Sequence, residues 1–89
     1  MILLVSVTRA TQVTFIVDMS EETVVAGDGG SPAVYVSGSN LNGPGGLVMT
    51  DNGNGIWELT TQLNPGSYTY KFRNGYYDSW DGPGWEGDN

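Results

Sequence analysis

The sequence predicts an all-β domain, a β-sandwich of short strands joined by tight turns. Its 89 residues include 14 glycines and four prolines, and the segments between these turn-forming residues alternate apolar and polar side chains with the period of two of half-buried strands. No segment has the spacing of a helix of useful length. A chain of this length forms one small domain with a modest core, and we expect that domain to span residues 11–89.

Alternation, or β-branched and aromatic content, predicts five strands, at residues 12–18, 33–38, 47–50, 56–62 and 67–73. The first strand places Val13, Phe15 and Val17 on one side. Ile16 on the other side predicts some burial on both faces. Residues 19–25 fit either a turn with a short further strand or a single helical turn.

Glycine-rich segments predict the loops. Residues 26–32 and 39–46 are long loops, and Asp51-Asn52-Gly53-Asn54-Gly55 is typical of a hairpin turn, because Asn and Gly tolerate the positive φ angles that such turns require. The same five residues also have oxygen ligands at alternate positions, as in a calcium loop. The hairpin turn is the better interpretation, because Glu58 follows too early to be the closing ligand of a calcium loop.

The predicted strand at residues 67–73 has the strongest alternation, between a Pro-Gly turn and an Asn-Gly turn. One face is aromatic and the other polar. The aromatic residues are Tyr68, Tyr70 and Phe72, and the basic residues of the polar face are Lys71 and Arg73. If the chain binds a ligand, we expect the ligand to bind here.

Both ends of the chain are unusual. Residues 1–7 form an apolar run that is too short to span a bilayer, and residues 1–10 could be the remnant of a secretion signal cleaved after Ala10. The alternatives are an additional strand or a tail. At the other end, residues 82–89 are turn-rich without a closing strand, so we expect a sandwich that lacks its last strand and has an open edge.

Composition excludes several classes of function. The chain has no histidine and no cysteine, so the commonest general base and the thiolate metal ligands are absent. Its core is too small for a deep catalytic cleft, and we expect neither an enzyme nor a cofactor. A net charge of -7 repels phosphate backbones and anionic lipids, so neither nucleic acid nor a membrane is an expected partner.

Aromatic residues in the C-terminal segment indicate a binding function. Four rings lie in a segment rich in Gly, Pro and Asp, namely Tyr76, Tyr77, Trp80 and Trp85. Flat rings beside hydrogen-bonding groups suit a sugar, whose C–H face stacks on the ring while its hydroxyls bind the polar groups. The alternative is that one or two rings cap the core. The acidic residues of this segment, Asp78, Asp81, Glu86 and Asp88, are interpreted as solvated surface charges.

The order of features resembles the early-set immunoglobulin-like domains. The motifs are Val34 to Asn40, Met49 to Trp57 and, after Pro-Gly, the Tyr-Thr-Tyr-Lys-Phe strand. They are similar to glycogen- and starch-binding modules, including the glycogen-binding domain of the AMP-activated kinase β subunit. Residues 13–20 also resemble the opening of such domains in secreted Bacteroidetes proteins.

The resemblance implies a sandwich whose glycan site uses the lysine of Tyr-Lys-Phe and a tryptophan soon after it, which correspond to Lys71 and Trp80. Glycogen binders carry another tryptophan in the loop that corresponds to residues 40–46, where this chain has no aromatic residue.

We therefore expect a non-catalytic carbohydrate-binding module of a secreted or cell-surface protein, with an α-glucan-like ligand. Tyr76, Tyr77 and Trp80 would stack on sugar, and Lys71, Asn74 and Asp78 would bind hydroxyls. The alternative is a structural or assembly module whose open edge pairs with a neighbouring domain or a second copy.

Overall fold

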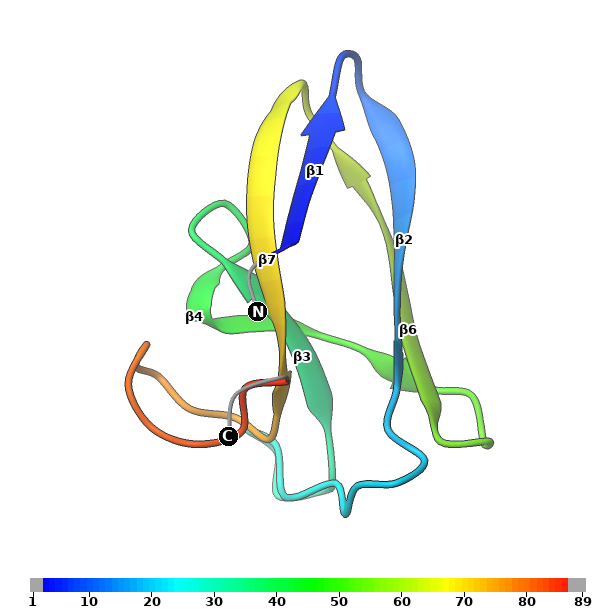
Figure 1. Ribbon diagram of the computed structural model, residues 1–89, viewed down its shortest axis with the longest axis vertical. Coiled ribbons are helices and arrows are strands. Elements are labelled where there is room, and N and C mark those ends of the chain that lie inside the picture. Colours follow the sequence, from blue (N-terminus) through cyan, green and yellow to red (C-terminus); the bar gives the residue numbers. More distant parts are fainter. Residues whose placement is uncertain (1–2, 87–89) are drawn as a thin grey trace.

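The computed structural model describes residues 3–86, and these form an all-β sandwich of two antiparallel sheets (Figure 1). Seven strands are present: β1 (Leu3–Val7), β2 (Thr11–Asp18), β3 (Val34–Gly38), β4 (Gly43–Val48), β5 (Thr50–Asp51), β6 (Ile56–Leu63) and β7 (Gly66–Asn74). The larger sheet has the order β1-β7-β3-β4, and the smaller has the order β2-β6-β5. The described residues contain no helix, as the sequence predicts.

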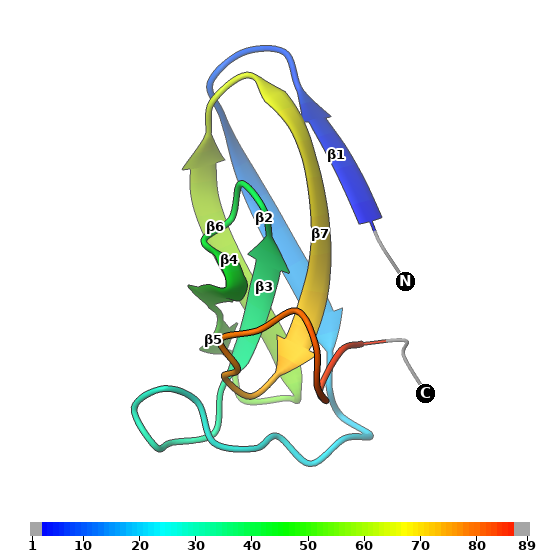
Figure 2. The same cartoon turned by 90° about the vertical axis from the view of Figure 1, so that its left-hand side faces the viewer.

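The strands of the two sheets form two layers (Figure 2), and the core between them is built mainly by the alternating residues of β2, β3, β6 and β7. Tyr68 and Phe72 of β7 are buried, and Tyr70 packs against them in the same core. Phe15 of β2 meets the Tyr70 ring edge-on, with 4.9 Å between ring centroids. The predicted aromatic face of β7 is therefore confirmed as the face that packs on the opposite sheet.

The predicted loop at residues 39–46 is wrong in its second half, because β4 begins at Gly43. Three of the four residues that open this strand are glycines, which have low strand propensity. Gly46 needs to be a glycine here: its φ is 73°, and a Cβ would lie 2.8 Å from the carbonyl oxygen of Val36 in β3. Glycine lets the two backbones approach closely and so forms the strand.

The predicted strand at residues 47–50 is split between the two sheets. Leu47 and Val48 end β4, whereas Thr50 and Asp51 form β5 in the other sheet. Met49 lies between them, 3% exposed, and its N–H donates to the carbonyl oxygen of Val34 at 2.8 Å. The predicted hairpin turn then joins β5 to β6, with the Asp51 carboxylate accepting a hydrogen bond from the N–H of Gly53 at 2.8 Å.

Two expectations for the N-terminal half also need correction. In residues 19–25 the expected turn is present, closed by the N–H of Glu22 donating to the carbonyl oxygen of Met19 at 3.0 Å, but neither the short strand nor a helical turn forms, and the rest is an irregular connection. Ile16 is 57% exposed rather than buried on a second face. The reason is that only the inner face of β2 packs against the larger sheet, whereas its outer face is in contact with solvent.

Residues 3–7 form β1, which pairs antiparallel with β7 from Leu3 opposite Tyr70 to Val7 opposite Gly66. An additional strand was one of the alternatives for this segment. The origin of residues 1–10 in a secretion signal and the domain limits at 11 and 89 stay predictions; residues 1–2 and 87–89 lie outside the described part of the chain.

Candidate binding groove

The segment after β7 turns back and pairs with the end of that strand. The N–H of Asn74 donates to the carbonyl oxygen of Gly84 at 2.8 Å, and the N–H of Glu86 donates to that of Phe72 at 2.9 Å. Trp85 thereby forms an antiparallel bridge with Arg73. These contacts hold residues 75–86 as an ordered lobe beside β7, which we call the C-terminal lobe.

Arg73 lies at the centre of the C-terminal lobe and is 1% exposed. Its guanidinium donates hydrogen bonds to four backbone carbonyls: Pro83 at 3.0 Å, Ser79 at 2.5 Å, Asp81 at 2.9 Å and Tyr77 at 3.4 Å. The guanidinium carbon also lies 4.0 Å from the Trp85 ring centroid and 4.7 Å from that of Tyr77. Burial lowers the pKa of Arg73, while the adjacent Tyr77 opposes this shift.

Arg73, predicted on the polar face of the strand, is therefore buried rather than exposed to solvent. The side chain does leave the outer face of β7, but the C-terminal lobe closes over it. A planar guanidinium with five N–H donors can satisfy several carbonyls that converge from one loop, which a lysine ammonium cannot do in the same plane.

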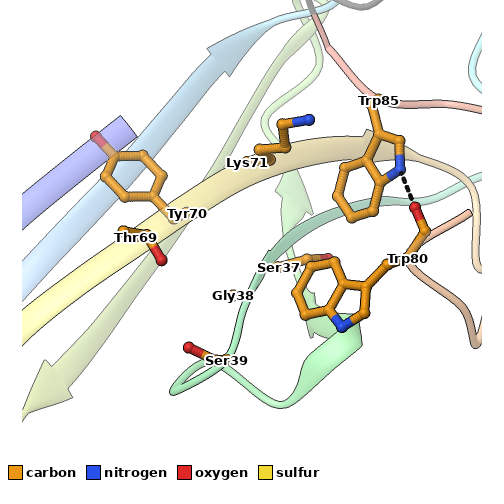
Figure 3. A pocket seen from close by; sticks show the side chains of 8 residues that line it. All are labelled: Ser37, Gly38, Ser39, Thr69, Tyr70, Lys71, Trp80 and Trp85. Carbon is orange, nitrogen blue, oxygen red and sulfur yellow. Dashed lines mark hydrogen bonds between the residues drawn. The ribbon is translucent and has the colours of Figure 1, made fainter. Parts of the chain in front are cut away.

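The C-terminal lobe presents two stacked tryptophans. The rings of Trp80 and Trp85 are 5.8 Å apart between centroids and only 15° from parallel. The indole N–H of Trp85 donates to the carbonyl oxygen of Trp80 at 3.1 Å (Figure 3). Trp85 is 8% exposed, whereas Trp80 is 51% exposed, so Trp80 offers a supported aromatic surface to solvent.

An open groove of about 320 Å³ lies between this tryptophan pair and the outer face of the larger sheet. Its lining residues come from β3 and the turn after it, from β7 and from the C-terminal lobe; they are Ser37, Gly38, Ser39, Thr69, Tyr70, Lys71, Trp80 and Trp85 (Figure 3). Lys71 is the charged member of this lining, and its ammonium lies 5.3 Å from the Trp85 ring centroid. The groove therefore combines indole surface, hydroxyl groups and one cation.

Two of the six predicted site residues, Lys71 and Trp80, line the groove. Asn74 lies elsewhere and connects β7 to an early loop: its side-chain oxygen accepts from the N–H of Val25 at 2.8 Å, and its amide donates to the carbonyl oxygen of Thr23 at 2.9 Å. Asp78 is exposed.

The two predicted tyrosines pack on the protein itself. The Tyr76 ring lies 5.6 Å from that of Tyr35, at an interplanar angle of 60°. The negative charge of Asp78, followed by burial, raises the pKa of Tyr76. Tyr77 covers the guanidinium of Arg73. The stacking partner of Trp80 is therefore Trp85 rather than a tyrosine.

The six predicted site residues did not include Trp85, Thr69 or the two serines of the groove, although Trp85 was one of the four aromatic residues that indicated binding. Thr69 could have been found, because it shares the polar face of β7 with Lys71. The serines could not, because Ser37 and Ser39 are brought to the groove by the pairing of β3 with β7, a long-range contact.

The acidic residues of the C-terminal segment are exposed where the structure describes them: Asp78, Asp81 and Glu86 lie on the surface, and Asp88 lies outside the described residues. Within residues 3–86, no three acidic side chains are grouped closely enough to hold a metal ion. The same residues contain no helix long and apolar enough to cross a membrane.

Comparison with known proteins found no match to this chain among protein-family models, curated proteins or solved structures.

Proposed function

We propose that this protein is a non-catalytic carbohydrate-binding module, and that the groove under Trp80 holds the sugar. The observation that carries the proposal is a half-exposed indole, 51% exposed, stacked on a second indole beside Lys71 and the hydroxyls of Ser39 and Thr69. An indole face suits the C–H face of a pyranose, while hydroxyls and an ammonium suit its oxygen atoms.

The dimensions of the groove favour a short stretch of sugar. Its volume of about 320 Å³ is at the lower end of the range for small-ligand sites. Because the groove is open, a bound sugar would stay partly hydrated, and ordering it costs conformational freedom. We expect weak binding of one or two sugar units from a longer chain.

The finer fold type is part of the proposal: the sandwich is of the early-set immunoglobulin kind. Two observations support it. In immunoglobulin-like sandwiches strands B, E and D share one sheet while C and F share the other. Here β2, β6 and β5 correspond to B, E and D in the smaller sheet, and β3 and β7 correspond to C and F in the larger sheet, beside β4. The Tyr68 hydroxyl, near the start of β7, donates to the carbonyl oxygen of Asn64 at 2.8 Å, as in the tyrosine corner of those domains.

The resemblance to glycogen- and starch-binding modules makes an α-glucan the first ligand to test and a secreted or cell-surface protein the expected setting. Lys71 and Trp80, the residues that the resemblance indicates, are the two predicted residues that share the groove. Support for the α-glucan comes from this correspondence.

The test is isothermal titration calorimetry of the protein with soluble starch, glycogen and a β-glucan. Calorimetry is preferable to tryptophan fluorescence because Trp80 would be both the binding surface and the reporter. We expect a saturable signal with starch or glycogen, and Trp80→Ala should weaken it at least about tenfold, which corresponds to about 1.4 kcal/mol. Lys71→Ala should weaken it less.

Val48→Ala is the matched control, because Val48 is 56% exposed but does not line the groove. It should bind like the unaltered protein. A folded protein that gives no signal with any of the polysaccharides, or a Trp80→Ala variant that binds normally, would rule out this groove as the sugar site.

A further inference from the structure

The free edge of β2 is a second surface with binding potential, separate from the groove. Within residues 3–86, β2 is the last strand of the smaller sheet, and it pairs with β6 on its other side. It is eight residues long, against five for β1 at the edge of the larger sheet. A long edge strand presents backbone N–H and C=O groups that can pair with another strand.

Natural edge strands are often protected by lysine, proline or a bulge, but β2 has a regular register with β6 and no charged residue before Asp18. Its outer face carries Thr14 and the apolar Ile16, both exposed. Beside it, an open cavity of about 380 Å³, lined mainly by apolar residues, lies between β2 and the β1–β7 side of the larger sheet. The residues of β2 that line it are Val13, Thr14, Phe15 and Ile16. This edge therefore lacks the usual protection against strand pairing.

The charges at the two ends of β2 favour antiparallel pairing with a second copy of the same strand. Arg9 precedes the strand, and Asp18, Glu21 and Glu22 lie at or after its end. A second β2 in parallel orientation would bring like charges together, whereas an antiparallel one places the basic end of each copy beside the acidic end of the other. We propose that the protein forms a two-fold symmetric dimer by antiparallel pairing of β2 with β2 of a second copy.

The side-chain alternation narrows the register. In an antiparallel pair, residues directly opposite each other have their side chains on the same face of the sheet. Two copies of β2 meet this condition only if the two-fold axis passes through a residue and not between two residues. With the axis at Phe15, each Thr14 lies opposite Ile16 of the second copy, and each Gln12 lies opposite Asp18. Arg9 then falls level with Glu21 of the second copy. The dimer would have a continuous sheet of six strands, with no like charges opposed within β2.

Dimerisation through β2 would affect ligand binding, although the dimer itself does not depend on a ligand. The groove lies on the outer face of the larger sheet, while β2 belongs to the smaller sheet. The dimer would keep both grooves open, and two weak sites on one particle would bind a polysaccharide through avidity.

The experiment is sedimentation velocity of the full chain at increasing concentration, combined with charge substitutions on exposed positions of β2. We expect the unaltered protein to change from monomer to dimer. Thr14→Lys/Ile16→Lys places lysines opposite lysines and should raise the dimer dissociation constant at least tenfold. Thr14→Glu/Ile16→Glu should do the same with glutamates.

Mixing the lysine variant with the glutamate variant should restore a dimer, because each lysine then faces a glutamate. The mixing experiment distinguishes loss of the dimer by charge repulsion from loss by misfolding, since unfolded variants would not recover a specific dimer. Val48→Lys is the control: Val48 is 56% exposed in β4, and its change should leave the dimer unaffected. An unaltered protein that stays monomeric, lysine and glutamate variants that dimerise normally, or a mixture that stays monomeric would overturn the proposal.

Discussion

Arg73 is the residue on which the candidate binding groove depends. Four carbonyl oxygens of the C-terminal lobe accept hydrogen bonds from its guanidinium, and two aromatic rings cover it. The lobe therefore has a cationic centre where a small domain would usually have apolar side chains. This arrangement positions Trp85, and Trp85 in turn supports the exposed ring of Trp80.

Arg73→Lys should destabilise the protein although it keeps the charge. A lysine has three N–H donors and cannot reach all four carbonyls, and each buried acceptor left without a donor costs about 1–3 kcal/mol. We expect a loss of at least about 2 kcal/mol in the free energy of unfolding. Urea denaturation measures it, and near-ultraviolet circular dichroism should show the tryptophan pair losing its fixed geometry.

Arg9→Lys is the matched substitution, because Arg9 is exposed in the turn between β1 and β2. It should leave the unfolding midpoint unchanged within about 0.5 kcal/mol. If Arg73→Lys were equally neutral and kept the near-ultraviolet spectrum, Arg73 would not be what organises the C-terminal lobe.

At the scale of the strands, β4 depends on glycine rather than on strand propensity. Gly43 and Gly46 both have positive φ, at 66° and 73°, but their surroundings differ. A Cβ on Gly43 would meet nothing within 4 Å, whereas one on Gly46 would collide with the Ser37 hydroxyl and the backbone of Val36. Substitutions at these two glycines therefore distinguish the cost of backbone strain from the cost of steric crowding.

Gly43→Ala should cost about 1 kcal/mol, the cost of placing an L-residue in the left-handed region. Gly46→Ala carries the same strain and adds overpacking, which typically costs about 1–3 kcal/mol more. Thermal and urea denaturation of the two variants measure the difference. Equal stabilities would mean that β3 and β4 can separate without cost, contrary to the close approach of their backbones.

The elements differ in how far they could be predicted from sequence. β2, β6 and β7 were predicted within one residue at either end, because their alternation reflects one buried face. The first four residues of β4 were missed, since glycines with close backbone contacts have the composition of a loop. The division of residues 47–50 between two sheets was also missed, because a chain that crosses from one sheet to the other has no local signal.

The candidate site was predictable only where it lies on a regular strand. Lys71 was found from the alternation of β7, and Trp80 from its position after that strand. The burial of Arg73 could not be predicted, because its partners are carbonyl groups, which every residue carries. Tyr76 and Tyr77 were grouped with Trp80 by proximity in sequence, whereas packing on Tyr35 and Arg73 directs them away from the groove.

At the scale of the whole molecule, β1 and the C-terminal lobe share one edge of β7. β1 pairs with its first half, up to Tyr70, and residues 84–86 pair with its end, from Phe72. The two terminal segments together complete the larger sheet along this edge of β7. The stability of this edge therefore involves both ends of the described chain.

This arrangement makes removal of residues 1–10 a decisive experiment. Val7 of β1 is buried, and Leu3 and Val5 pack against the core. Because burial of an aliphatic side chain contributes about 1.5–3 kcal/mol, and two of these three are only partly buried, a chain that starts at Thr11 should lose about 2–4 kcal/mol in the free energy of unfolding. Urea denaturation of the full chain and of the chain that starts at Thr11, monitored by circular dichroism, measures this difference. If residues 1–10 are instead a secretion signal that the folded domain does not use, the two chains will unfold at the same urea concentration, and the edge of β7 will be open to another strand.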